Sequence, residues 1–214
     1  MGRCNTSVFK KILAAGLLAS TAAAFAQANT PTISCSTNPA IFNTGIDGTN
    51  GYSETSGKIT PANGTMADAH WNIAPIAGTV KPSVSVPPYD PTQDATLNFQ
   101  PASVYYNGAW AVSPFGNAQW IGSGVFSYGT VFYRYDFNLD PSINPSTFNL
   151  KFDLYVDDSI YQVYVNGVPL FGAGTHIGGY TQSGFASIIL NQHWQTGANS
   201  IIIQTYNATN PTGL

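Results

Sequence analysis

The sequence contains few charged side chains. Of its 214 residues, 8% are Asp, Glu, Lys or Arg, against about 25% in an average soluble protein. Clustered Lys and Arg residues, on which most nucleic-acid binding depends, are missing. The residues that dominate helical bundles and coiled coils, namely Glu, Lys, Arg and Leu, are also scarce. The composition therefore excludes a helical bundle and predicts no nucleic-acid partner.

The sequence also lacks a long hydrophobic run. Residues 12–24 form its longest apolar stretch, which is too short and too rich in Ala, Ser and Thr for a spanning helix of about 20 residues. Arg3, Lys10 and Lys11 precede this stretch, and small residues follow it at Ala24 and Ala26. This order is typical of a secretory signal peptide. We expect residues 1–26 to be removed on export, which gives a secreted or cell-surface protein without a membrane span.

Cysteine and positive charge are nearly absent from the exported part. Cys4 lies in the signal peptide, so Cys35 has no partner for an internal disulfide. The fold must therefore be stabilised by its core. After residue 26, four basic residues face ten acidic ones, which gives a formal net charge of −6. An acidic surface favours solubility and disfavours anionic partners.

Aromatic residues and alternating patterns are abundant by contrast. Tyr, Phe and Trp make up 13% of the sequence. Residues 130–139 and 148–157 alternate apolar and polar side chains, which predicts strands with one buried face. Asn166 and Gly167 lie between β-forming residues and predict a hairpin turn, and residues 105–110 predict a second hairpin. Many short strands of this kind predict an all-β protein with an antiparallel β-sandwich.

Several motifs, taken in order, resemble a known family. They are found at residues 133–139, 157–158, 163–167 and 194–201, and then, more narrowly, at 42–45, 68–71, 118–122 and 210–214. In this order the motifs resemble the galactose-binding-like jelly-roll domains of secreted bacterial proteins of the PEP-CTERM-associated type, which are similar to carbohydrate-binding modules. The resemblance implies a jelly roll and an extracellular glycan ligand.

The resemblance also gives an expected domain organisation. Residues 1–26 are expected to be the signal peptide, 27–39 an N-terminal linker and 40–214 the β-sandwich domain. In the family, the Pro-Thr-Gly-Leu segment is followed by a further short strand. Because this chain stops at Leu214, we expect a domain that is truncated at its C-terminal end.

Aromatic and polar residues near turns are the candidate ligand-binding residues. Sugars stack on flat rings while polar side chains bond their hydroxyls, and binding sites combine apolar walls with a few polar groups in this way. For each Trp, the alternative is a place in the sandwich core. Trp110, beside the predicted turn at Asn107, is expected to be an exposed platform and Trp120 a core residue. The candidate set is Asp68, His70, Trp71, Asn107 and Trp110.

Three carboxylates are the candidate metal ligands. Carboxylates and loop carbonyls are ligands that Ca²⁺ prefers, and related jelly rolls often hold a structural calcium. Asp153, Asp157 and Asp158 could supply such a site, and calcium is the one cofactor considered. Asp157 and Asp158 are a poor pair for glycoside hydrolysis because neighbouring strand residues point to opposite faces. The alternative is a turn in which the carboxylates accept bonds from local backbone N–H groups.

These observations lead to three hypotheses about function. The first is a secreted, non-catalytic module that binds carbohydrate or another matrix or cell-surface polymer. The second is a structural subunit of an extracellular matrix, filament or surface layer, in which an open sheet edge accepts a neighbour's strand. The third is an accessory domain of a glycan-active enzyme. The fold alone does not choose between them.

Overall fold

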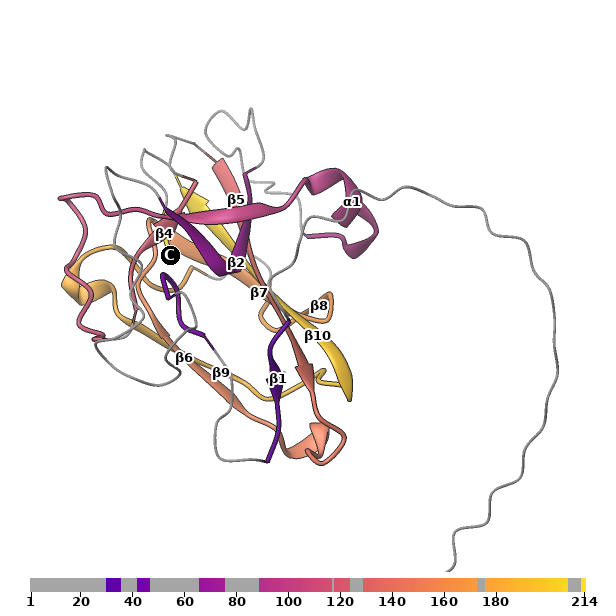
Figure 1. Cartoon of the computed structure of the whole chain (residues 1–214). Coiled ribbons are helices and arrows are strands. Elements are labelled where there is room, and N and C mark those ends of the chain that lie inside the picture. The colour runs from indigo at the N-terminus through magenta and orange to yellow at the C-terminus, as the bar shows by residue number, and fades with distance from the viewer. Residues whose placement is uncertain are drawn as a thin grey trace, which may run out of the picture.

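The computed structural model describes residues 30–35, 42–46, 66–75, 89–116, 118–123, 129–172, 176–207 and 213–214. These residues form a mostly antiparallel β protein (Figure 1). The strands are β1 Thr32–Ile33, β2 Met66–Pro75, β3 Gln100–Val104, β4 Ile121–Gly122, β5 Gly129–Leu139, β6 Leu150–Leu154, β7 Ser159–Val165, β8 Val168–Pro169, β9 Ala186–Leu190 and β10 Gly197–Asn207. The short helices are α1 Asp94–Leu97 and the 3-10 turns η1 Pro91–Gln93, η2 Pro145–Thr147 and η3 Gln182–Gly184. The all-β prediction is confirmed.

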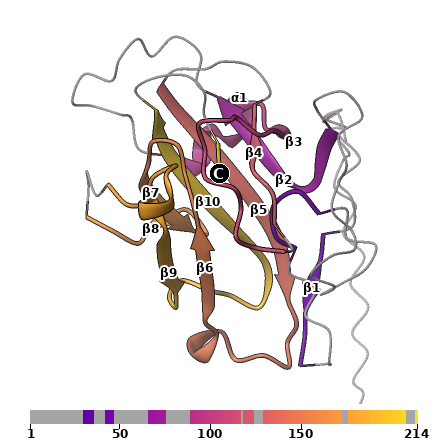
Figure 2. The same ribbon diagram turned by 90° about the vertical axis from the view of Figure 1, so that its left-hand side faces the viewer.

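The strands form two sheets of unequal size. The large sheet has the order β4-β3-β2-β5-β10-β7-β8, and β1 pairs in parallel with the end of β5. The small sheet consists of β6 and β9. Figures 1 and 2 show β6 and β9 as a separate layer facing the long strands β5 and β10. The small sheet therefore covers only part of the large one.

The core lies between the two sheets and follows the predicted alternation. All five predicted inward side chains of β5, at alternate positions from Val131 to Leu139, are at most 1% exposed. They pack with inward residues of β10 and with Leu154 and Ile188 of the small sheet. The predicted strand at 148–157 is shorter than expected, but Leu150, Phe152 and Leu154 pack on the core as the pattern predicted. Burial of these alternate side chains supplies the main driving force for the fold.

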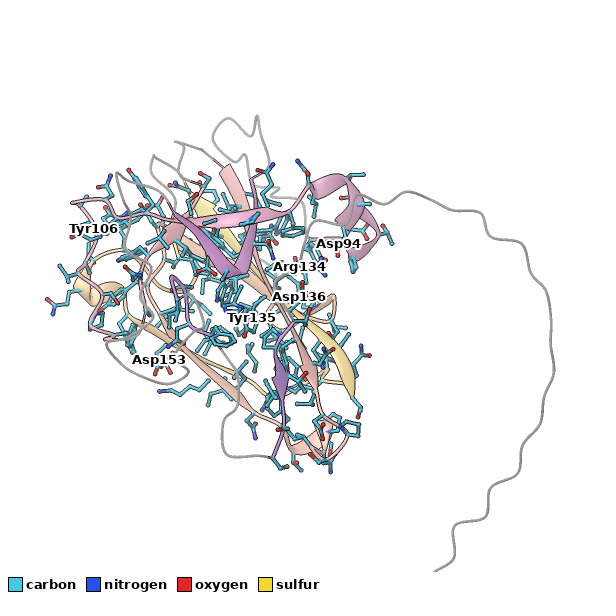
Figure 3. All side chains as sticks on the ribbon, in the orientation of Figure 1. Asp94, Tyr106, Arg134, Tyr135, Asp136 and Asp153 are labelled. Atoms are coloured by element: carbon cyan, nitrogen blue, oxygen red, sulfur yellow. The ribbon has the colours of Figure 1, made fainter. Side chains whose placement is uncertain are left out.

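The outer face of β5 is covered as well, which the alternation did not predict. Phe132 packs with Tyr89, Tyr164 and Ile202 in a second cluster. The α1 segment closes this cluster through Arg134, whose Nη1 lies 2.6 Å from the Asp94 carboxylate and whose Nε bonds Asp136. Figure 3 shows these three charged side chains on the side of the sheet where α1 lies.

Two sequence predictions need correction at the level of the backbone. The predicted linker at residues 27–39 contains β1, whose Thr32 and Ile33 pair with Asn138 and Leu139 of β5. The apolar Ile33 joins the core at 3% exposure, and this burial fixes the segment on the sheet. The hairpin predicted at residues 105–110 is not formed, because this segment is a turn that directly follows β3, and β3 pairs instead with β4 at Ile121–Gly122.

The hairpin predicted at Asn166 and Gly167 is confirmed. It joins β7 to β8, with positive φ angles of 50° and 79° at the two turn residues. Such a pair of left-handed residues matches the twist of the flanking strands. The predicted signal peptide lies outside the described residues. Within the described ranges, no helix has the length and apolar character needed to cross a membrane.

Candidate functional site

A groove follows one edge of β6, and we call it the β6 groove. On one side it is lined by all five residues of β6 and by Tyr155, and on the other by residues 42–44, 118–120, Ser113 and Phe115. Trp71, Tyr135 and Ile203 of the large sheet form its floor, and Leu214 closes one end. The cavity volume is about 110 Å³. Figure 3 places Tyr135 between the two layers and Asp153 at the outer side of the molecule.

The edge of β6 that faces the groove has no backbone partner among the described residues. Antiparallel pairing with β9 runs from Leu150 opposite Leu190 to Leu154 opposite Ala186. Beyond this pairing, β6 forms no backbone–backbone hydrogen bond with any described residue. In an antiparallel strand, the backbone groups that do not face one neighbour face the other side. The groove therefore meets a row of backbone donors and acceptors as well as aromatic rings.

Residues 42–46 form one wall of the groove and are anchored to the floor. The backbone N–H of Phe42 donates to the Tyr135 hydroxyl at 3.0 Å, and the Trp71 indole N–H donates to the Phe42 carbonyl at 3.2 Å. Thr44 exchanges two hydrogen bonds with the backbone of Gln119, at 2.6 and 2.9 Å. These contacts fix the width of the β6 groove from the side opposite β6.

Asp68 anchors the same wall from a bulge in β2. Pairing of β2 with β3 shifts register between Ala67 and Asn72, which frees backbone N–H groups from the ladder. The buried Asp68 carboxylate accepts from the N–H groups of His70 and Trp71, both at 2.8 Å, and from Gly45 at 2.5 Å. Burial raises the pKa of Asp68 to about 6, and these three bonds limit the rise. Asp68 therefore links the loop to the sheet.

His70 and Trp71 lie beside Asp68. His70 packs against the wall of the groove, and Trp71 forms part of its floor. The imidazole of His70 stacks on Phe42, with ring centroids 3.9 Å apart and planes 8° apart. Trp71 is 3% exposed and contributes to the floor. The structure thus brings three predicted residues, Asp68, His70 and Trp71, to one place.

Trp110 is not the exposed platform that the sequence predicted. It is 3% exposed, because it stacks on Trp120 at 4.5 Å and packs edge-on with Tyr105. Asn107 acts in the turn that positions it, since its side-chain oxygen accepts from Ala109 N–H at 2.9 Å. Trp120, as expected, belongs to the core. All four Trp residues are less than 9% exposed.

The three candidate metal ligands do not converge on one point. Asp153 lies on the outer face of β6, where it pairs with Lys151 at 2.8 Å, whereas Asp157 is 4% exposed. No group of three or more His, Cys, Asp or Glu side chains in the described part of the chain could hold a metal ion. The described carboxylates therefore give the predicted calcium site no support, and it stays a prediction.

Asp157 and Asp158 form a pair of contacting carboxyl groups. They lie in the bend between β6 and β7, where the opposite-face rule for strands does not apply. The Trp110 indole N–H donates to Asp157 at 2.6 Å. Burial raises the pKa of Asp157 to about 7; the Trp110 bond opposes this rise, and the hydrogen bond and charge of Asp158 add to it.

The charge of Asp157 also acts on the buried Tyr133 hydroxyl. Burial, and then the charge of Asp157, raises the pKa of Tyr133. The hydroxyl has no hydrogen-bond partner among the described residues. Asp157 also holds the backbone of Gly213 through its own N–H at 3.0 Å. The backbone of Asp157 therefore holds the segment at residues 213–214.

Sequence reasoning missed the β6 groove because its lining comes from eight separate segments. The alternation at 148–157 predicted the strand but not which strand lies beside it. Phe42 and Gln119 were quoted only as parts of motifs, and Tyr135 and Phe152 only as core-facing strand residues. A hint was present in residues 42–45 and 118–122, which are Asn- and Gln-containing segments that form the wall opposite β6.

Comparison with protein-family models, with curated proteins and with solved structures finds no match.

Proposed function

We propose that this chain is a secreted, non-catalytic binding module whose ligand lies in the β6 groove. The observation that carries the proposal is the combination, in one groove, of aromatic walls with polar groups at the rim. Phe42, Phe115 and Phe152 supply half-buried rings, and Lys151 and Asp153 supply charges. Ligand sites of soluble proteins combine apolar walls and a few polar groups in this manner.

The ligand class that we propose first is a carbohydrate, or another polymer of the matrix or cell surface. The resemblance of the motifs to galactose-binding-like jelly rolls supports this class. The half-buried rings of Phe42, Phe115 and Phe152, which line the groove, replace the buried Trp110 as the surfaces against which a sugar could stack. We also propose that the fold is a jelly roll, since two facing antiparallel sheets are compatible with that fold.

The groove supports a binding role better than a catalytic one. Most glycoside hydrolases place two carboxyl groups across the scissile bond. Among the described residues that line the β6 groove, Asp153 is the one carboxylate, and it is paired with Lys151. The contacting pair Asp157 and Asp158 does not line the groove.

A polysaccharide panel tests this proposal. The chain from residue 27 is passed over immobilised glycans in buffer with Ca²⁺ and in buffer with EDTA. We expect retention on one glycan class and loss of at least about tenfold in affinity for Ser113→Trp, because a bulky ring would fill the groove. Val112→Trp is the matched control, since Val112 is adjacent but 78% exposed and does not line the groove.

Equal retention of the two variants would place any glycan outside the groove and contradict the proposal. Loss of retention in EDTA would show that a metal takes part in binding. Its ligands would then have to include groups other than the described carboxylates. A second function, as a structural subunit, is favoured by the second edge of β6, which has no backbone partner among the described residues.

A further inference from the structure

A cluster of aromatic rings extends from the β6 groove to the surface. Phe115 and Tyr155, which line the groove, both contact the ring of Phe185, at centroid distances of 6.2 and 5.8 Å. Phe185 itself does not line the groove, and it is 47% exposed although a large aromatic side chain favours burial. The apolar lining of the groove therefore continues outward over Phe115 and Phe185, and we call these two rings the outer ring pair.

Two segments that are far apart in the sequence position the outer ring pair. Phe115 comes from the loop after β3, and Phe185 directly follows the η3 turn. The backbone N–H of Ala111 donates to the Tyr180 carbonyl at 2.7 Å, which joins the two segments. Figure 1 shows both segments at the left-hand side of the molecule, and Figure 2 shows the same side facing the viewer. The two rings therefore belong to one face.

The turn that carries Phe185 is tightly packed. A Cβ added at Gly184 would lie 2.5 Å from the backbone of Gly179, so only glycine fits there. The Gly184 N–H donates to the Thr181 carbonyl at 2.8 Å, and the Gly179 carbonyl accepts from the Val156 N–H at 3.2 Å. These contacts fix the backbone that holds Phe185 at the surface. A ring that is fixed before binding loses little conformational entropy when a ligand covers it.

The two segments that carry the outer ring pair contain no charged residue. Both fall within residues 95–133 and 159–214, which include no Asp, Glu, Lys or Arg. Beside Phe185, the chain exposes three uncharged polar side chains, those of Thr181, Gln182 and Ser183. At the rim of the groove, Lys151 and Asp153 have opposite charges and pair at 2.8 Å. A ligand that covers the rings therefore meets neutral hydrogen-bonding groups and no net charge.

These properties fit a neutral polysaccharide better than a charged glycan or a protein. Flat rings stack on the C–H faces of sugars, and uncharged polar groups bond their hydroxyls. A charged glycan would find no counter-charge in the two segments, and the formal net charge of −6 after residue 26 would repel a polyanion. Protein interfaces are enriched in Arg and Met as well as aromatic residues, and residues 105–116 and 176–185 contain neither.

We infer that Phe115 and Phe185 form a stacking surface that extends the β6 groove and selects an uncharged polysaccharide chain. The inference rests on the proposed function in taking the groove as the binding site. It names the class of glycan, and it adds a binding residue, Phe185, that lies outside the groove. One sugar of the chain enters the groove, and a neighbouring sugar lies on the outer ring pair.

A panel of immobilised polymers divided by charge tests the class of glycan. The neutral members are a β-glucan, a galactomannan and a xyloglucan, the anionic members are polygalacturonate and alginate, and the cationic member is glycol chitosan. The full chain is applied at physiological ionic strength, where long-range attraction between exposed charges is screened. We expect retention on at least one neutral polymer and on none of the charged ones. Retention on charged polymers alone would overturn the inference.

Substitutions at Phe185 test the ring itself. Phe185→Leu keeps an apolar side chain to pack on Tyr155 but removes the flat ring, and it should lower the affinity for the retained neutral polymer by about fivefold or more. Phe185→Tyr keeps the ring and should keep the affinity of the unmodified protein. Val168→Ala is the matched control, since Val168 is 40% exposed on β8, at the opposite edge of the large sheet from β3 and β4. An equal loss in Phe185→Leu and Val168→Ala, or none in Phe185→Leu, would overturn the inference.

The groove variant Ser113→Trp separates the inference from the proposed function. Loss of binding in Ser113→Trp with unchanged affinity in Phe185→Leu would leave the groove as the binding site and overturn the inference. Loss in Phe185→Leu with unchanged affinity in Ser113→Trp would refute the groove as the site and confine the glycan to the stacking surface. Self-association that Phe185→Leu abolishes, without retention on any glycan, would assign this face to a protein interface and overturn the inference.

Discussion

Two buried carboxyl groups, Asp68 and Asp157, lie in opposite hydrogen-bonding environments. Each is 4% exposed, and burial raises the pKa of each. Asp68 faces donors, since three backbone N–H groups bond its two oxygens. Asp157 lies between a donor, the Trp110 indole N–H, and an acceptor, the carboxyl of Asp158.

The difference shows that burial alone does not define the role of a carboxyl group. A group surrounded by donors is best satisfied when ionised, since a carboxylate offers only acceptors. A group between a donor and a carboxylate is best satisfied when it carries a proton, which it can donate to its neighbour. Asp68 therefore acts as an acceptor for the loop at residues 42–46, and Asp157 as a proton-sharing partner of Asp158.

Replacement by Asn should have opposite outcomes at the two positions and gives the largest effect that we expect. In Asp68→Asn, the amide NH2 would meet one of the three backbone N–H groups, which would remain buried and unbonded. We expect the free energy of unfolding at pH 7 to fall by about 2 kcal/mol. In Asp157→Asn, the amide can accept from Trp110 and donate to Asp158, so we expect no loss of stability at pH 7.

Urea denaturation of the two variants checks this comparison. Asp153→Asn is the control, because Asp153 lies on the exposed face of β6 and its ion pair with Lys151 contributes little. A loss for Asp157→Asn as large as that for Asp68→Asn would contradict the assigned proton sharing. Loosening of residues 42–46 in Asp68→Asn should also raise hydrogen exchange at Gly45 and Gln119, whose N–H groups bond across this wall.

The Asp157 region also depends on close packing of Gly213 against Trp110. A Cβ added at Gly213 would lie 2.5 Å from the Trp110 ring, so Gly213→Ala must displace the ring that bonds Asp157. We expect a loss of about 1–3 kcal/mol in the free energy of unfolding. Gly108→Ala is the matched control, since a Cβ there meets nothing within 4 Å. Equal thermal midpoints of the two variants would show that residues 213–214 do not pack on Trp110 in solution.

The sequence predicted the parts of this protein that depend on local periodicity. The alternation at 130–139 predicted β5 and its inward face, because a strand buried on one side requires a period of two. Asn166 and Gly167 predicted the β7–β8 hairpin, because few residue pairs tolerate two positive φ angles. In both cases the residues that carry the signal are also the residues that form the structure.

Features that depend on residues far apart in sequence were not predicted. Trp110 looked exposed beside a turn, but its ring stacks on Trp120 and bonds Asp157, 47 positions away. Asp157 and Asp158 looked like opposite-facing strand residues, but β6 ends at Leu154. The β6 groove itself exists because the small sheet contains two strands, which no local pattern specifies.

The two carboxyl groups should also separate in their dependence on pH. Both have pKa values above the ordinary 3.8, about 6 for Asp68 and about 7 for Asp157. Folding therefore disfavours ionisation, so the stability that the neutral forms contribute is fully present below about pH 4 and is lost as pH rises through these two values. Denaturation of the unmodified protein should therefore show a free energy of unfolding that falls as pH rises from 5 to 8.

Asp157→Asn sharpens this measurement, because it removes the titration near pH 7 and keeps the hydrogen bonds. The variant should lose the upper part of the decrease and become more stable than the unmodified protein at pH 8, while the two remain similar at pH 5. An unchanged slope between pH 6 and pH 8 would show that the titrating group is elsewhere. Because Asp157 contacts Gly213 and Trp110, the same titration reports on the stability of residues 213–214 beside the β6 groove.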